Sequence, residues 1–271
     1  MNSLLTIVWD VDPEAFTIPF IDWPVRWYGL LFVFGLLVSQ YILFHVFEKE
    51  GRTKKNVEDL TIYVIIGTIV GARLGHVIFY DLSDYLENPI EIIQIWKGGL
   101  ASHGGAIGIL TAVYLYCRKY KFQFLWLMDR LVIVVCFTGA CIRVGNLMNS
   151  EIIGTVTDVP WAFQFMQAYP PSLSADPRHP AQLYEALYCL VLMGILWTIW
   201  KNHRNKLANG FMFGVFLVIL FTLRFIDEFF KINQVAFEDS LPLNMGQILS
   251  VPFVLLGLYL IWRARKIMSK K

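Results

Sequence analysis

The sequence has little charge. Only 16% of its 271 residues are Asp, Glu, Lys or Arg, whereas 56% are hydrophobic, and the mean hydropathy is +0.54. This composition argues against an ordinary soluble domain and is typical of an integral membrane protein. The formal net charge is only +2, and the basic residues form short clusters instead of one continuous face. We therefore expect no nucleic-acid partner.

The sequence also lacks the cysteine spacing of a metal site or a disulfide framework. Its four cysteines all fall within or at the ends of apolar runs: Cys117, Cys136, Cys141 and Cys189. We expect them to be small buried hydrophobic side chains, and we expect no metal and no redox cofactor. The first 24 residues contain no lysine or arginine. No cleavable signal peptide is predicted, and the first apolar segment is expected to act as its own targeting signal.

Long apolar runs dominate what is present. A membrane-spanning helix needs about 20 mostly apolar residues. The segments that approach this length are about 27–47, 58–80, 100–117, 124–147, 181–200, 210–230 and 245–262. The sequence thus predicts an all-α integral membrane protein with seven transmembrane helices, forming a single polytopic domain over residues 1–271. Residues 148–180 are too many for a simple turn and predict a small extracytoplasmic cap between the fourth and fifth spans.

The connections between these segments predict the orientation, because lysine and arginine concentrate on the cytoplasmic side of a membrane. Every second connection is basic, and these connections hold Lys49, Arg52, Lys54, Lys55, Arg118, Lys119, Lys121, Lys201, Arg204, Lys206, Arg263, Arg265, Lys266, Lys270 and Lys271. The opposite connections have only Lys97, Arg178 and Lys231, together with several acids. The N-terminus is therefore predicted outside and the C-terminus in the cytoplasm.

Several basic residues lie inside the apolar segments, where a charge is expensive and usually functional. With a rise of about 1.5 Å per residue, Arg73, Arg143 and Arg224 lie about 21–29 Å from the cytoplasmic start of their spans. Arg26 begins the first span and His103 lies near the outer start of the third. The sequence therefore predicts a polar chamber in the outer half of the membrane.

Arg143 is the principal candidate in this chamber. Asn146 follows it at i+3 and shares its helix face. A guanidinium beside an amide is suited to holding a phosphate by charge-assisted hydrogen bonds. A structural salt bridge, with Glu151 as a candidate partner, is the alternative. Arg224 and Glu228 are spaced at i and i+4 for a direct ion pair, which could also be purely structural.

His103 is the candidate base. It lies within a flexible, glycine-rich stretch at 98–105, and an unperturbed imidazole titrates near neutral pH. A hydrogen bond in helix packing is an equal alternative. Gln182 and Glu185 share a face at the outer mouth of the fifth span and are either caps or site walls. Gly67, Gly71 and Gly75 recur every fourth residue, which indicates close helix packing.

The sequence has neither a His-Glu-x-x-His motif nor a Gly-x-Ser-x-Gly elbow, so no covalent nucleophile is expected. An arginine-rich chamber open to the outer leaflet suggests an enzyme that handles an anionic phospholipid. A lipid or organic-anion transporter is the main alternative, although the cytoplasmic half has only Asp129 and Arg130 as a comparable polar pair. A non-catalytic receptor for exported proteins is a third hypothesis.

Taken in order, the polar motifs resemble those of the bacterial prolipoprotein diacylglyceryl transferase family over nearly the whole chain. They are Arg26-Trp27-Tyr28-Gly29, Gly71-Ala72-Arg73-Leu74-Gly75, His103-Gly104-Gly105, Arg143 through Glu151, Arg178-His179-Pro180 with Gln182 and Tyr184-Glu185, Arg224 with Glu228-Phe229-Phe230, and Met245 through Ser250 before Pro252. The family signature around the arginine reads Gly-Arg-x-Gly-Asn-Phe-x-Asn-x-Glu. Here Ile142 and Leu147 replace the glycine and the phenylalanine, while the polar positions are kept.

The resemblance implies transfer of the diacylglyceryl group of phosphatidylglycerol to the lipobox cysteine of a prolipoprotein signal peptide, with no cofactor, in the bacterial cytoplasmic (inner) membrane. It implies a site facing the outer leaflet. The catalytic residues would be Arg143, His103 and Arg224. The substrate-binding or supporting residues would be Tyr28, Arg73, Asn146, Glu151, Gly154 and Glu228.

Overall fold

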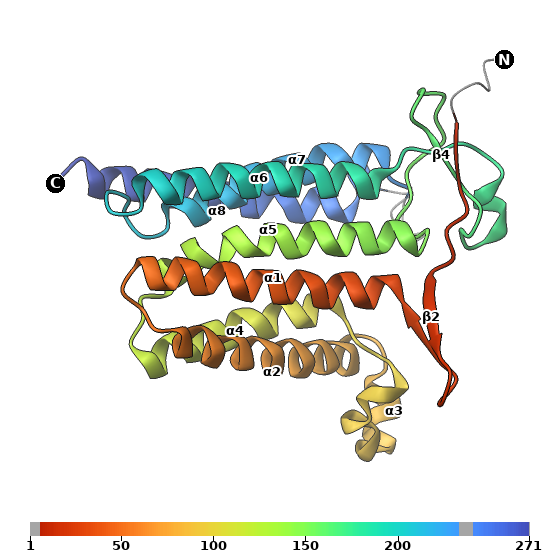
Figure 1. The fold of residues 1–271 in the computed structure, drawn as a ribbon, viewed down its shortest axis with the longest axis horizontal. Coiled ribbons are helices and arrows are strands. Elements are labelled where there is room, and N and C mark those ends of the chain that lie inside the picture. Colours follow the sequence, from red (N-terminus) through yellow and green to blue (C-terminus); the bar gives the residue numbers. More distant parts are fainter. Residues whose placement is uncertain (1–5, 233–240, 271) are drawn as a thin grey trace. The chain divides into compact units, whose positions relative to one another are not determined.

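Eight α-helices dominate the part of the chain described by the computed structural model, which covers residues 6–232 and 241–270 (Figure 1). They are α1 (Trp27–Lys49), α2 (Lys54–Phe79), α3 (Leu82–Glu87), α4 (Ser102–Tyr120), α5 (Phe124–Met148), α6 (Ala181–His203), α7 (Phe211–Asp227) and α8 (Met245–Met268). Short 3-10 turns occur at η1 (Pro89–Ile93), η2 (Ile95–Lys97), η3 (Pro171–Ser174) and η4 (Glu228–Phe230). The prediction of a helical protein is thus confirmed.

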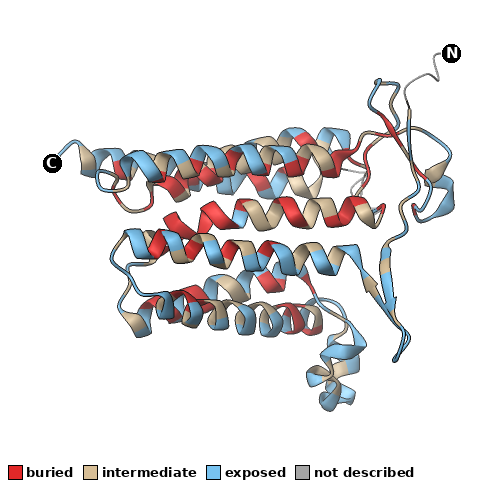
Figure 2. Cartoon of the chain, in the orientation of Figure 1, coloured by how far each residue is buried: buried red, intermediate tan, exposed pale blue. Residues whose placement is uncertain are grey.

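Five of these helices, α1, α2, α5, α6 and α8, are long and apolar enough to cross a membrane. Large hydrophobic side chains lie exposed along several of them, for example Leu37, Ile66 and Leu255, and Figure 2 shows the exposed positions along α1, α2 and α8. Exposed apolar faces of this extent mark contact with lipid. The helices α4 and α7 coincide with the remaining two predicted spans, but have only 19 and 17 residues.

Two small sheets were not predicted. The strand β1 (Ile7–Trp9) pairs in parallel with β4 (Phe163–Phe165), and β2 (Glu14–Ile18) forms an antiparallel hairpin with β3 (Trp23–Arg26). The predicted cap region contains β4 and η3, and its buried residues Ile153, Phe163, Phe165 and Ala168 form a core with Leu147 of α5, against which Trp9 packs. Residues 148–180 are therefore folded against the N-terminal strand.

The chain forms two compact units. The first combines the chain up to Ser39 with the chain from Met128 onward, and the second is Gln40–Leu127. In the second unit, α2 and α4 approach so closely that a Cβ added to Gly71 would lie 2.5 Å from the Gly104 carbonyl oxygen. The predicted glycine face of α2 is thus confirmed as a packing surface.

The first unit positions the ends of α5, α6 and α7. Asp129, near the start of α5, accepts hydrogen bonds of 2.8 Å from the backbone N–H groups of Gly210 and Phe213, so it caps the first turn of α7. Asn244 begins α8 with a capping box that includes Gln247. The Asp129 contacts thus join the starts of α5 and α7, whose opposite ends carry Arg143 and Arg224.

Candidate active site

Arg143 lies in the last two turns of α5, with its side chain 19% exposed. Its Nε is 2.7 Å from Oε2 of Glu185, in the first turns of α6. Its Nη1 donates a 3.0 Å hydrogen bond to Oδ1 of Asn146. The guanidinium is therefore held on two sides. Among the described residues, its second terminal nitrogen, Nη2, has no protein partner.

Glu151 supports this arrangement without a direct pair to Arg143. Its Oε1 accepts hydrogen bonds from Nδ2 of Asn146 at 2.8 Å and from Nδ2 of Asn149 at 3.2 Å. Gln182 donates a 2.6 Å hydrogen bond to the backbone carbonyl of Glu151. The salt bridge that the sequence suggested between Arg143 and Glu151 is thus replaced by a relay through Asn146, and the ion-pair partner of Arg143 is Glu185.

Lys231, directly after η4, joins three carboxylates. Its Nζ lies 2.6 Å from Oε1 of Glu185, 3.0 Å from Oε1 of Glu228 and 3.1 Å from Oδ2 of Asp227. Burial alone would lower the pKa of Lys231, but these three carboxylates outweigh burial and raise it. The side chain is 3% exposed and stays charged.

Arg224, in the last turn of α7, is the most exposed of the three cations, with 39% of its side chain accessible. Its Nη2 lies 3.7 Å from Oε1 of Glu228, so the predicted i and i+4 pair is present but long. The other oxygen of Glu228, Oε2, accepts a 3.2 Å hydrogen bond from Nδ2 of Asn244. Arg224 therefore retains donors for another anion.

Tyr28 and Gly154 pack around this network. A Cβ added to Gly145 would lie 2.8 Å from Cδ2 of Tyr28, so the tyrosine ring lies directly on α5, two residues after Arg143. Gly154 forms an antiparallel bridge with Lys231. A Cβ on Gly154 would lie 2.5 Å from the His179 carbonyl oxygen and 2.6 Å from that of Phe230. A side chain larger than that of glycine would therefore clash at position 154, where the backbone pairs with that of Lys231.

A polar pocket of about 240 Å³ opens beside Glu151. It is lined by Asp12, Pro13, Glu14, Arg26, Asn149 and Glu151. The pocket lies between the β2–β3 hairpin and the end of α5. One of its walls is Glu151, whose carboxylate accepts the hydrogen bond from Asn146.

His103 and Arg73 belong to the second unit and are described within it. His103, the second residue of α4, is exposed and packs its ring against Phe79 and Tyr80, at centroid distances of 5.2 and 5.9 Å. Among the described residues it has no hydrogen-bond partner. The imidazole nitrogens are therefore available to a substrate.

Arg73 is buried, and its donors are committed to the segment between α2 and α4. Its Nε donates to the carbonyl of Ile92 at 2.8 Å, and Nη1 donates to the carbonyls of Gly98 and Gly99 at 2.6 and 3.0 Å. Its Nη2 donates to the carbonyl of Glu91, and the guanidinium lies 4.9 Å from the centre of the Tyr85 ring. This geometry favours a supporting role for Arg73 over contact with substrate.

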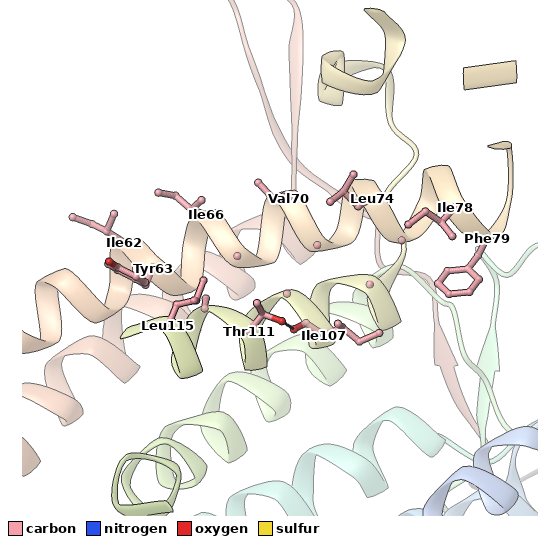
Figure 3. Close-up of a pocket in the computed structure, with 16 residues that line it drawn as sticks. Ile62, Tyr63, Ile66, Val70, Leu74, Ile78, Phe79, Ile107, Thr111 and Leu115 are labelled. Atoms are coloured by element: carbon pink, nitrogen blue, oxygen red, sulfur yellow. Dashed lines mark hydrogen bonds between the residues drawn. The ribbon is translucent and has the colours of Figure 1, made fainter. Parts of the chain in front are cut away.

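The second unit also has an apolar groove of about 550 Å³ between α2 and α4. The groove is lined by Ile62, Ile66, Val70, Leu74 and Ile78 along α2 and by Ile107, Thr111 and Leu115 along α4 (Figure 3). Thr111 turns its hydroxyl to the carbonyl of Ile107, at 2.9 Å. Phe79, the ring that contacts His103, closes one end of the groove.

Comparison with known proteins agrees with the ordered motifs. The family model described as prolipoprotein diacylglyceryl transferase matches residues 13–263. The chain belongs to the prolipoprotein diacylglyceryl transferase family.

Relatives in this transferase family are similar along nearly their whole length. A protein of Porphyromonas gingivalis named phosphatidylglycerol–prolipoprotein diacylglyceryl transferase is 46% identical, over 96% of this chain and 95% of the relative. Proteins of the same name from Tolumonas auensis and Chloroherpeton thalassium are each 43% identical, over 96% and 98% of this chain and 98% and 97% of the relatives.

The sequence did not predict the ion pairs of two charged residues, Glu185 and Lys231. Glu185 was expected to be a cap or a site wall, but it contacts Arg143 directly. Lys231 was counted only as a basic residue of an outer connection, but it is buried between three carboxylates. Its position three and four residues after Glu228 and Asp227 was the one available signal, since this spacing favours ion pairs at a helix end.

Proposed function

We propose that the chain transfers the diacylglyceryl group of phosphatidylglycerol to the lipobox cysteine thiol of a prolipoprotein signal peptide. The observation that carries the proposal is the fixed guanidinium of Arg143, held by Glu185 and Asn146 with one terminal nitrogen open, in a chain of this transferase family. The names of the relatives supply the lipid and the protein substrate. An open donor on an oriented arginine is what a lipid phosphate requires.

The reaction forms one carbon–sulfur bond and breaks one carbon–oxygen bond. The thiol first gives its proton to a base, for which His103 is our candidate because it is exposed and its ring nitrogens have no hydrogen-bond partner among the described residues. The thiolate attacks the carbon of the diacylated glycerol unit that is bonded to a phosphate oxygen. The electrons of the broken carbon–oxygen bond pass to that oxygen, and glycerol phosphate leaves with one additional negative charge.

Arg143 and Arg224 would stabilise the charge that grows on the departing phosphate, by preorganised electrostatic interaction. Asn146 and Glu151 would hold Arg143 in place. Tyr28, Glu228 and Gly154 would support the same region, and Arg73 would fix the segment before α4. The groove that ends at Phe79 would accept hydrocarbon beside His103.

The topology is part of the proposal. It has seven transmembrane helices, with α4 and α7 completing the five longer ones, in a single polytopic domain over residues 1–271 with an extracytoplasmic cap at 148–180. The N-terminus is outside and the C-terminus is cytoplasmic in the bacterial inner membrane, with the site facing the outer leaflet. The basic connections support this orientation.

The direct test is to incubate the purified protein with phosphatidylglycerol and a lipobox peptide and to measure the mass of the peptide. We expect a mass increase of one diacylglyceryl group. Arg143→Ala should lower the rate roughly 100- to 1000-fold, the loss typical of removing one transition-state donor. Arg118→Ala, a matched change at an exposed arginine at the end of α4, should leave the rate unchanged.

A near wild-type rate for folded Arg143→Ala would remove the central assignment. Movement of lipid or organic anions across proteoliposomes, without modification of the peptide, would favour the transporter alternative.

The role of His103 has its own test. We expect His103→Gln to slow a single turnover and to change the pH profile of the transfer rate, because a glutamine amide cannot accept the thiol proton. An unchanged single-turnover rate and an unchanged pH profile would leave the two arginines as the catalytic groups and require another base.

A further inference from the structure

Lys231 is connected to both candidate arginines through shared carboxylates. Glu185 connects it to Arg143: Oε1 of Glu185 faces Lys231 at 2.6 Å and Oε2 faces Arg143 at 2.7 Å. Glu228 connects it to Arg224, because Oε1 of Glu228 lies 3.0 Å from Lys231 and 3.7 Å from Arg224. One buried ammonium is therefore linked to each guanidinium through a single carboxylate.

The charges of this network balance. Its cations are Arg143, Arg224 and Lys231, and its carboxylates are Glu185, Asp227 and Glu228. The uncharged neighbours are Tyr188, whose hydroxyl donates to Oε2 of Glu185 at 3.1 Å, and Asn244, which donates to Glu228. Among the described residues, Asp227 forms an ion pair with Lys231 alone. Asp227 can thus be neutralised without removing the carboxylate that holds either arginine.

We infer that Lys231 is a positioning residue for the transfer reaction: it neutralises the carboxylates behind Arg143 and Arg224, so that both guanidiniums keep donors for the lipid phosphate. The inference rests on the proposed function. Lys231 itself cannot serve as a donor to the lipid, because its side chain is 3% exposed and its Nζ lies within 3.1 Å of oxygens of three carboxylates.

Loss of the ammonium would harm the site in two ways. Two arginines would face three carboxylates, which would draw both guanidiniums into internal pairs. The region would also carry a net charge of about −1, by simple count of these groups, which opposes the approach of an anionic phospholipid. A substitution that restores neutrality without disturbing Arg143 should therefore restore activity.

The experiment compares Lys231→Met with two double variants, each of which removes one carboxylate as well. We expect Lys231→Met to lower kcat/KM for phosphatidylglycerol roughly 100-fold, comparable to loss of a transition-state donor. Lys231→Met with Asp227→Asn should recover at least about 10-fold of this loss, because the charges balance again and Glu185 still holds Arg143. Lys231→Met with Glu185→Gln also balances the charges but releases Arg143, so it should not recover.

The matched control is Lys201→Met, at an exposed lysine at the far end of α6, which should behave as wild type. Thermal unfolding in detergent is measured for every variant. If Lys231→Met alone does not fold, the two double variants are compared with each other, and the Asp227→Asn double variant should be the more active.

Equal activity of the two double variants, or no recovery in a folded Asp227→Asn double variant, would overturn the inference while leaving the proposed function intact. Absence of transfer by the wild-type protein would overturn both. A purely structural role for Lys231 predicts changes in thermal stability without the difference between the double variants.

Discussion

At the scale of single residues, the protein stabilises buried charges by pairing them with specific polar partners. Asn146 turns its oxygen to Arg143 and its nitrogen to Glu151, and Glu185 uses separate oxygens for Arg143 and Lys231. Removing one member of such a buried pair leaves its partner uncompensated, which typically destabilises by about 3–5 kcal/mol. Substitutions in the candidate site are therefore also expected to lower the stability of the first unit.

The substitution Gly154→Ala is predicted to destabilise the protein for a steric reason. A methyl group in Gly154→Ala would meet two backbone carbonyl oxygens, those of His179 and Phe230, at 2.5 and 2.6 Å. The backbone must shift, so we expect a loss of about 1–3 kcal/mol. The measurement is the midpoint of thermal unfolding in detergent.

The control for this change is Gly194→Ala in α6, where an added Cβ meets no atom within 4 Å. It should raise stability slightly, by about 0.5–1 kcal/mol, because alanine favours a helix over glycine. Equal unfolding midpoints for Gly154→Ala and Gly194→Ala would show that the Gly154 segment yields without strain.

The sequence predicted those residue contacts that depend on local spacing. Arg143 and Asn146 share a helix face, as their i and i+3 spacing indicated, and Arg224 lies near Glu228 at i+4. The pairs of Arg143 with Glu185 and of Glu185 with Lys231 join separate elements. No periodicity specifies which helix packs against which, so these contacts required the structure.

At the scale of elements, hydropathy located the helices well and some of their ends less well. The predicted segment 124–147 is observed as Phe124–Met148, because apolar residues fill the helix to its end. The segment 245–262 continues as α8 through Arg263 and Lys266 to Met268. A helix extends past the apolar region wherever its backbone hydrogen bonds continue, so hydropathy marks the membrane region instead of the helix boundary.

The strands show a different limit. In β1 and β4 only three residues of each strand pair, and the partners Ile7 and Phe163 are far apart in sequence. Such short strands have too few residues for a period-2 pattern to be detected. The length of 148–180 nevertheless predicted more than a simple turn, and in the structure Phe163 and Phe165 of this region are buried.

At the scale of the whole molecule, the question that decides the proposed topology is whether α4 and α7 cross the membrane. With the N-terminus outside, as proposed, the cap at 148–180 would lie outside if all seven helices cross. If only the five longer helices cross, the same cap would lie in the cytoplasm, whereas the C-terminus would be cytoplasmic in both arrangements. The cap is thus the informative position, and the C-terminal end of α8 is the matched reference.

Cysteine labelling distinguishes the two arrangements. The four native cysteines are buried, so background reaction with a membrane-impermeant maleimide should be low. Asp158→Cys in the cap and Ser269→Cys after α8 both change exposed positions. For seven spans with the N-terminus outside, the thiol at 158 should react in intact spheroplasts and the thiol at 269 only after permeabilisation, because the basic connections keep α8 ending in the cytoplasm. Protection of the thiol at 158 in intact cells, with reaction after permeabilisation, would instead favour five spans and place the cap on the side opposite to the proposed outer-leaflet site.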